Sequence, residues 1–340
     1  MAFGIDPTWG QCWNDYVIYT SVGFCVARST IPGNARSPYK LNEQQVSFPR
    51  FSIYEHSSGK QGGQTIMTMA AKTITNLHNK KIPSSLRHYT TLEAFKEMLQ
   101  PWLNSDDDGV APFLNFHASL FSKMNDANEG KIIYDRFFTE SIRKQAYKEK
   151  YDEFLNGRRQ YIISLTRSTL SLDILPMWFT YADGAKGIYL RFNGQKLLDW
   201  AKSENDCELD SCFYMKSKNI ANTIQKLNLT VPKQGQSIGY FFRKLTYEAV
   251  LSKNQCWEYE DEWRIVKLET NNNAKQKATN RGLVEYIDIH IPLDALAEVR
   301  IGPKANKEWV RKSLDFLLCK IKAKCGQCNI KVTESIIKLQ

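Results

Sequence analysis

One stretch constrains the fold of this chain more than any other: residues 256–268, with the sequence CWEYEDEWRIVKL. Within it, four carboxylates fall in five residues: Glu258, Glu260, Asp261 and Glu262. They lead directly into an alternating run of apolar and polar residues, 263–268, which is typical of a β-strand. An acidic cluster at the start of a strand is usually a solvated device that protects a sheet edge.

The spacing of Glu260 and Glu262 favours a second interpretation. In an extended chain, residues two apart point to the same face, with about 7 Å between their Cα atoms. Two carboxylates so placed can share one substrate. The acidic residues at the start of this strand therefore either protect an exposed sheet edge or form part of a substrate-binding site.

Length and composition predict a soluble globular protein of one large domain or two small ones, because 340 residues of which 42% are hydrophobic can bury a substantial core. No run approaches the roughly 18 apolar residues of a membrane span, and the first residues lack a signal-peptide pattern. We therefore expect a cytoplasmic protein with no membrane partner. Its eight cysteines are scattered, which predicts reduced thiols.

The order of the expected elements predicts an α+β fold with a mixed or antiparallel central sheet and flanking helices. We expect strands at residues 86–89, 161–166, 188–192, 243–250, 263–268, 284–291 and 330–336. A capping box at Thr90 and Glu93 predicts a helix from Leu92, and further helices are expected at residues 175–182, 195–203 and 305–322. Residues 116–126 should lead into another helix, and residues 292–303 should connect a strand to a helix.

The core is expected to span residues 86–340, with an insertion at 204–238. Residues 1–85 form an accessory region of unknown role. His88 falls at the end of a strand, where a structural histidine is as common as a site residue. Trp178 and Tyr181 share one face of a short helix, and core packing explains that pair as well as ligand stacking does.

Several familiar patterns are absent from the sequence: the phosphate-binding loop, Gly-x-Gly-x-x-Gly after a strand, and His-Glu-x-x-His. Cys325 and Cys328 have the spacing of half a zinc site, but no second Cys/His pair lies near them. We therefore expect no metal.

Five segments of the chain resemble, in order, those of a bacterial family catalogued as domain of unknown function 2971. They are residues 87–90, 118–129, 163–166, 177–187 and 257–264. The resemblance extends over residues 86–340 apart from 204–238, and the family name implies no activity.

The same segments resemble, more weakly, the ADP-ribosyltransferases. These enzymes surround NAD with a strand-borne His or Arg, a later Tyr or Ser-Thr strand, and a Glu at the start of a late strand. Two assignments compete. One uses His88, Tyr181 and Glu262. The other uses Arg87, Ser164 with Thr166, and Glu260 with Glu262.

This second resemblance implies an NAD-consuming enzyme that transfers ADP-ribose to an unknown protein or nucleic-acid acceptor, or hydrolyses NAD, as a bacterial toxin or anti-phage defence effector would. Breaking the nicotinamide–ribose bond develops positive charge on the sugar, so a fixed carboxylate stabilises the transition state. Glu262 would fill that role, Glu260 would orient the acceptor, and His88 would hydrogen-bond the ribose.

The remaining candidate NAD-binding residues implied by the resemblance are Arg87, Tyr89, Ser164, Thr166, Trp178 and Tyr181. Tyr189 in the next strand is a rival of Tyr181. Arg264 fits a structural ion pair with the carboxylates as well as a contact to the pyrophosphate.

A nucleic-acid-binding or nucleic-acid-modifying protein is the alternative, because a net charge of +10 and exposed aromatic residues would suit a single strand. However, the aromatic residues lie mostly in expected strands and are not interleaved with arginine, which favours the NAD hypothesis. A non-enzymatic interaction module is the third class.

Overall fold

The computed structural model describes most of residues 80–338, and all of these belong to the second of the two units into which the chain divides, Thr73–Gln340. Within that range it leaves out residues 108, 124–129, 131–132, 135–136, 139–146, 157–158, 168–172, 216–226, 228, 230–236, 270–272 and 280–281. The predicted accessory region, residues 1–85, therefore lies outside the described residues except for 80–85.

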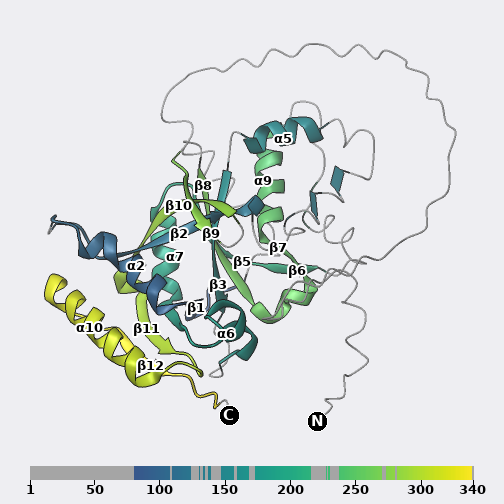
Figure 1. Cartoon of the computed structure of the whole chain (residues 1–340). Helices are drawn as coiled ribbons and strands as arrows, with labels where there is room; N and C mark the ends of the chain where they lie inside the picture. The colour runs from purple at the N-terminus through teal and green to yellow at the C-terminus, as the bar shows by residue number, and fades with distance from the viewer. Residues whose placement is uncertain are drawn as a thin grey trace, which may run out of the picture. The chain divides into compact units, whose positions relative to one another are not determined.

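A ten-stranded sheet forms the centre of the described residues (Figure 1). Its main path runs in the spatial order β12 (Lys331–Glu334), β11 (Leu296–Ile301), β4 (Ile188–Asn193), β1 (Ser85–Thr90), β3 (Arg159–Arg167), β2 (Phe113–Leu120), β10 (Gly282–Pro292) and β9 (Lys275–Thr279). Beyond β3 lie β8 (Glu262–Glu269) and then β5 (Cys207–Ser211). The pairs are antiparallel except β11 with β12, and a separate parallel pair joins β6 (Phe213–Met215) and β7 (Ser252–Asn254).

Strand β3 pairs with two different strands along one of its edges. β1 pairs with Thr166 and Arg167 near the end of β3, whereas β2 pairs with Tyr161 and Ile162 near its start. Among the described residues, 163–165 have no strand partner at this edge. The sheet therefore opens into a fork between β1 and β2, and the unpaired backbone groups of β3 must find other hydrogen-bond partners there.

Three amphipathic helices pack on the main core: α2 (Leu92–Leu103), α7 (Gly194–Ser203) and α10 (Lys307–Cys325). α10 buries Val310, Leu314, Leu317 and Ile321, a spacing that places them on one helix face. Figure 1 shows α10 beside α2, and Lys324 Nζ in α10 donates to the Trp102 carbonyl in α2 at 2.7 Å.

A second core joins α5 (Lys148–Asn156) to α9 (Ile238–Leu251), and α6 (Leu175–Tyr181) packs on a third around Trp178. Three short 3-10 turns complete the described elements: η2 (Phe121–Lys123), η4 (Gln255–Glu260) and η5 (Leu293–Ala295). No helix in these ranges is both long enough and apolar enough to span a bilayer. Helices flanking a mixed sheet confirm the predicted α+β class.

The predicted strands at 86–89, 161–166, 188–192, 263–268 and 284–291 are confirmed to within a few residues. Residues 243–250, predicted as a strand, are instead part of helix α9. There Phe241, Phe242, Leu245 and Ala249 are buried at helical spacing, and the Ser237 hydroxyl caps the first turn.

Two further segments form strands that the sequence does not predict. Residues 116–120, predicted to lead into a helix, belong to strand β2, because Leu114, Phe116 and Ala118 are buried at strand spacing. Residues 296–301, predicted as part of a connection, form β11. Strand β5 lies within the predicted insertion 204–238, yet it pairs along β8 in the main sheet.

Helix α2 begins at Leu92, as predicted, but its N-cap lies one residue later than the predicted capping box. Thr90 is the last residue of β1, where it pairs with Ile188, so it cannot cap the helix. The N-cap is Thr91, whose hydroxyl accepts from the Ala94 N–H at 3.0 Å. The cap matters for the site because α2 carries Glu97 into the cavity described below.

We expect Thr91→Ala to lower the free energy of unfolding by about 1 kcal/mol, because the first turn of α2 loses its hydrogen-bond acceptor. Urea unfolding followed by circular dichroism measures the change. Thr91→Ser keeps the hydroxyl and should stay within a few tenths of a kcal/mol of the parent. An unchanged midpoint in Thr91→Ala would show that Thr91 does not cap the helix.

Candidate functional site

The residues predicted from the sequence gather in two places. Glu260, Glu262 and Tyr181 meet where η4 joins β8. His88 and Ser164 line a cavity in the fork between β1 and β2.

The two carboxylates lie on either side of a break between a turn and a strand. η4 ends at Glu260, Asp261 has a left-handed backbone with φ of 40°, and β8 begins at Glu262. The predicted extended spacing is therefore wrong, because Asp261 turns the chain between the two carboxylates. Arg167 holds this turn, with its Nε donating to Asp261 Oδ2 at 2.5 Å.

Both carboxylates nevertheless share one partner, Lys253 of β7. Its Nζ lies 2.5 Å from Oε2 of Glu260 and 2.7 Å from Oε2 of Glu262. Arg264, which is fully buried, donates from Nε and Nη2 to the two carboxylate oxygens of Glu262 at 3.0 and 2.9 Å. We call Lys253, Glu260, Glu262 and Arg264 the carboxylate cluster. Its two positive and two negative charges balance, which is what allows them to be buried together.

Glu262 is ionised at neutral pH despite its burial. Burial favours the neutral acid, but attraction and hydrogen bonds from Arg264 and Lys253 outweigh it and lower the pKa of Glu262 to about 2. Glu260 and Glu262 are each only 3% exposed. Glu262 is therefore a fixed negative charge shielded from water, which is the kind of group that stabilises a developing positive charge.

Tyr181 forms an exposed side of the carboxylate cluster. Its hydroxyl donates to Oε1 of Glu260 at 2.6 Å, while the residue is 36% exposed. Burial of the hydroxyl and the nearby charge of Glu260 raise the pKa of Tyr181, so the phenol stays protonated at neutral pH. Tyr259 of η4 is also exposed, at 42%. A ligand that approaches the carboxylates from solvent on this side meets tyrosine rings first.

Arg87, Thr166 and Glu262 lie in one row across three adjacent strands. The register places Arg87 directly opposite Thr166, and Thr166 directly opposite Glu262. Directly opposed residues project from the same face of a sheet. The row thus brings together one Arg, one Thr and one Glu, as the second of the two competing assignments requires. Ser164, two residues before Thr166, lies opposite Arg264.

A buried aromatic group lies beside the row. Tyr89, Trp178 and Tyr189 pack with ring centres 5.1 to 5.4 Å apart, and the guanidinium of Arg87 lies 4.9 Å from the centre of the Tyr189 ring. Trp178 is fully buried, so neither face of its ring is open to a ligand. Of the two residues expected to stack on nicotinamide, only Tyr181 reaches the surface.

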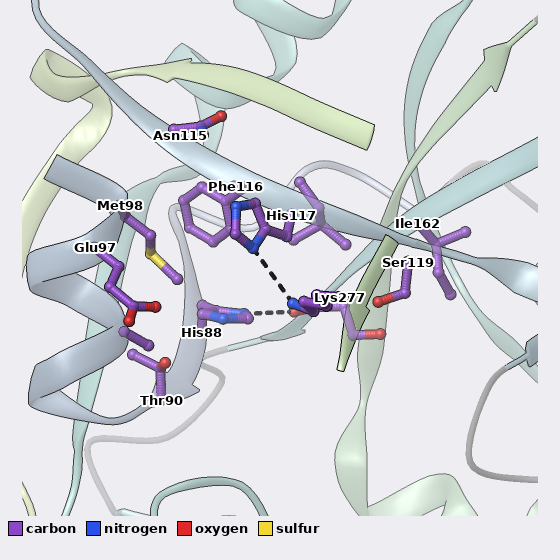
Figure 2. A pocket seen from close by; sticks show the side chains of 13 residues that line it. His88, Thr90, Glu97, Met98, Asn115, Phe116, His117, Ser119, Ile162 and Lys277 are labelled. Atoms are coloured by element: carbon purple, nitrogen blue, oxygen red, sulfur yellow. Dashed lines mark hydrogen bonds between the residues drawn. The ribbon is translucent and has the colours of Figure 1, made fainter. Parts of the chain in front are cut away.

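A cavity of about 320 Å³ opens at the fork between β1 and β2 (Figure 2). We call it the fork cavity. Its principal polar lining residues are His88, Glu97, Asn115, His117, Ser164 and Lys277. Arg87 and His88 are neighbours in an extended strand and so point to opposite faces. The fork cavity therefore meets β1 on the face opposite Arg87, whereas Ser164, which also lines it, shares a face of β3 with Thr166 of the row.

His88 forms a hydrogen bond with one of the backbone groups of β3 that have no strand partner at the fork. Its Nδ1 lies 3.0 Å from the Ser164 carbonyl oxygen. A carbonyl only accepts, so Nδ1 carries the hydrogen. Burial lowers the pKa of His88 more than this hydrogen bond raises it, which keeps the ring neutral. Nε2 then holds a lone pair and is the atom available to a ligand.

His117 links a lysine to a carboxylate. Lys277 Nζ lies 3.3 Å from Nδ1 of His117, and Nε2 of the same ring lies 3.6 Å from Oδ1 of Asp288. Burial, with the nearby charge of Lys277, lowers the pKa of His117 although Asp288 opposes the shift. Asn115 Nδ2 donates to Asp288 Oδ1 at 3.1 Å, which fixes the carboxylate.

Sequence reasoning missed the His117 group altogether. Residues 116–126 were predicted to lead into a helix, and that prediction hid the strand pattern of residues 113–120. Read as a strand, the segment places Asn115, His117 and Ser119 on one face, opposite the buried Leu114, Phe116 and Ala118. That alternation was the available signal. Nothing in the sequence marks Lys277 as the partner of His117.

The carboxylate cluster should make stability fall in acid. The pKa of Glu262 is lowered from 4.5 to about 2, so its contribution is fully present above about pH 4.5 and is lost as the pH falls toward 2. At pH 7 we expect Glu262→Gln to lower the free energy of unfolding by about 3–5 kcal/mol, because Arg264 stays buried without its partner. The difference from the parent should shrink as the pH approaches 2.

Urea unfolding at neutral pH and at several acidic values measures this difference. A difference that keeps its full size down to the lowest pH would contradict the ionised state of Glu262 in the folded chain.

The comparison with known families bears on the carboxylate cluster. Residues 177–265 match the model of one family, described as "Protein of unknown function (DUF2971)". No curated protein and no solved structure matches the chain. The matched segment runs from α6 to β8 and contains Tyr181 and all four residues of the carboxylate cluster. The chain is therefore similar to this family of unknown function over residues 177–265, and the predicted resemblance is confirmed over that segment.

Proposed function

We propose that this chain consumes NAD, either by transferring ADP-ribose to an acceptor or by hydrolysing the dinucleotide, in the bacterial cytoplasm as a toxin or anti-phage effector. The observation that carries the proposal is the row of Arg87, Thr166 and Glu262 on one face of three adjacent strands. It supports the assignment that begins at Arg87, because the side chain of His88 leaves the strand on the other face.

The chemistry of the bond explains why a buried carboxylate would help. Cleavage of the nicotinamide–ribose bond leaves positive charge on the ribose ring. Glu262 is ionised, and Lys253 and Arg264 fix it in place. A charge that needs no rearrangement and is little screened by water stabilises such a transition state more than an exposed one does.

Tyr181 is the residue that would meet the substrate. Its hydroxyl is bound to Glu260, so the ring is held in one orientation at the surface. A fixed and partly exposed aromatic ring suits stacking on the nicotinamide. Arg87, Ser164 and Thr166 would contact the ribose and the pyrophosphate. Glu260 would orient the acceptor through the same hydrogen-bonded group.

The nucleic-acid alternative receives less support from the same region. Lys253 and Arg264 are engaged with carboxylates, and Arg87 lies over an aromatic ring. Cations engaged in this way are not displayed as a track for phosphates. The net charge of +10 remains compatible with a nucleic-acid acceptor.

Nicotinamide release from NAD by the full chain, with cell extract supplied as a source of acceptors, tests the proposal. We expect Glu262→Gln to lower the rate at least about 100-fold, because the fixed charge is removed while the shape is kept. Chromatography of the nicotinamide product gives the rate.

The chain offers a matched control in Glu298, which is also buried and paired with two arginines, at 2.6 Å from Arg191 and 2.9 Å from Arg300. Glu298→Gln disturbs a similar buried ion cluster outside the proposed site, so its loss of activity should only follow its loss of folded protein. Equal losses in the two variants, or no nicotinamide release by the parent, would overturn the proposal.

A milder variant distinguishes a loss of catalytic rate from a loss of folded protein. Tyr181→Phe removes one hydroxyl from a partly exposed ring, and we expect it to lower nicotinamide release about tenfold, because the ring loses the hydrogen bond that holds it against Glu260. Tyr240→Phe is the control, since Tyr240 is exposed to a similar degree, at 41%. Release that is the same in both variants would remove Tyr181 from the site.

A further inference from the structure

Lys277, His117 and Asp288 form a chain of polar contacts at the fork cavity. Two of these contacts run through the imidazole: Lys277 Nζ to Nδ1 at 3.3 Å, and Asp288 Oδ1 to Nε2 at 3.6 Å. The three residues come from the neighbouring strands β9, β2 and β10. Figure 2 shows His117 above the cavity, joined to Lys277 by a dashed line.

With Lys277 as an ammonium, which only donates, Nδ1 of His117 holds the lone pair that faces Nζ. In the neutral ring Nε2 then carries the hydrogen, on the side of Asp288, whose Oδ1 lies 3.6 Å away, beyond hydrogen-bond distance. The ring of Tyr286 lies under both groups, 4.3 Å from the imidazole centre and 5.2 Å from Lys277 Nζ. A base held between a nucleophile and an orienting carboxylate is the arrangement that activates nucleophiles in enzymes.

The surroundings also favour the neutral amine. Burial lowers the pKa of Lys277, and Glu97 opposes the shift only in part. Lys275, two residues earlier on the same strand, behaves in the opposite way. It is exposed, and its ion pair with Asp288 raises its pKa. The surroundings of the two lysines therefore shift their pKa values in opposite directions.

We propose that Lys277 is a nucleophilic amine that forms an imine with a small aldehyde or ketone bound in the fork cavity, with His117 as its base. This inference does not depend on NAD consumption, because its reactive residues, Lys277 and His117, have no role in that proposal. Of the residues proposed to contact NAD, only Ser164 lines the cavity. The cavity of about 320 Å³ lies at the lower end of the size range of small-molecule sites.

The step balances without any oxidant. The lone pair of Nζ forms a bond to the carbonyl carbon, and the π electrons of the carbonyl move to its oxygen. His117 Nδ1 takes a proton from the attacking nitrogen, and the imidazolium is stabilised by Asp288. The imidazolium gives this proton to the oxyanion, which becomes the hydroxyl of a carbinolamine. His117 Nδ1 then takes the second amine proton and delivers it to that hydroxyl as the C–O bond breaks and the C=N bond forms. The two hydrogens of the amine and the carbonyl oxygen leave as one water molecule.

The lining selects an uncharged, hydroxylated carbonyl compound. His88 presents a lone pair on Nε2, which accepts from a ligand hydroxyl. Glu97 lines the cavity and repels a ligand carboxylate. Phe116 and Ile162 supply apolar contacts for a short carbon chain. A small hydroxyaldehyde is the chemical class that meets all three conditions.

The experiment uses glyceraldehyde as the probe and sodium cyanoborohydride as the reductant that fixes any imine. The full chain is incubated near pH 7.5 without NAD, and the adduct at each lysine is quantified by peptide mass spectrometry. We expect Lys277 to be modified at least about tenfold faster than Lys275. This comparison within one protein needs no variant, so it stands even if a variant fails to fold. Equal rates at the two lysines would overturn the proposal.

Two variants test the role of the base. Lys277→Arg should remove the adduct at that position and leave the rate at Lys275 unchanged. His117→Gln should slow modification of Lys277 at least about tenfold and move the midpoint of its pH profile, because the proton acceptor is gone. A His117→Gln protein that folds and shows the parent's rate and pH profile at Lys277 would exclude His117 as the base and overturn the proposal as stated.

Discussion

The start of β8 depends on one lysine that neutralises two carboxylates. Without Lys253, Glu260 and Glu262 would repel each other in a place from which water is excluded, and Arg264 alone could not balance both. Arg264 also donates from Nη1 to the backbone carbonyl of Val250, close to where α9 ends. The cluster thereby joins α9, β7, η4 and β8, and a change in any of its charges affects the packing of all four elements.

This arrangement changes the meaning of the acidic stretch that opens β8. The sequence predicts either a solvated edge or a pair of carboxylates that share a substrate. The structure places Glu260 and Glu262 in the interior, and what they share is Lys253. A functional role for Glu262 must therefore act through its fixed charge, because direct access by solvent is blocked. An electrostatic role of this kind is compatible with burial, whereas a role as a freely exchanging acid is not.

The elements that sequence analysis located are those whose pattern is local. The strand that holds Ser164 and Thr166 and the helix that holds Tyr181 follow from short runs of apolar residues and their boundaries. Helix α9 was missed because its apolar residues also fit a strand over the short window 243–250. Lys253 could not be found, because nothing near it in the sequence distinguishes it from other lysines. Its role arises only when β7 is brought against η4 and β8.

The strand β1 explains why two assignments of the site could compete. Its residues alternate between two faces of the sheet, so the segment from Arg87 to Thr90 serves two different environments. Arg87 and Tyr89 meet the buried aromatic group, while His88 and Thr90 line the fork cavity. Glu262 shares a face with Arg87, so a site that contains Glu262 takes its β1 residue from that face. His88 lies on the other face and lines the fork cavity, as His117 and Lys277 also do.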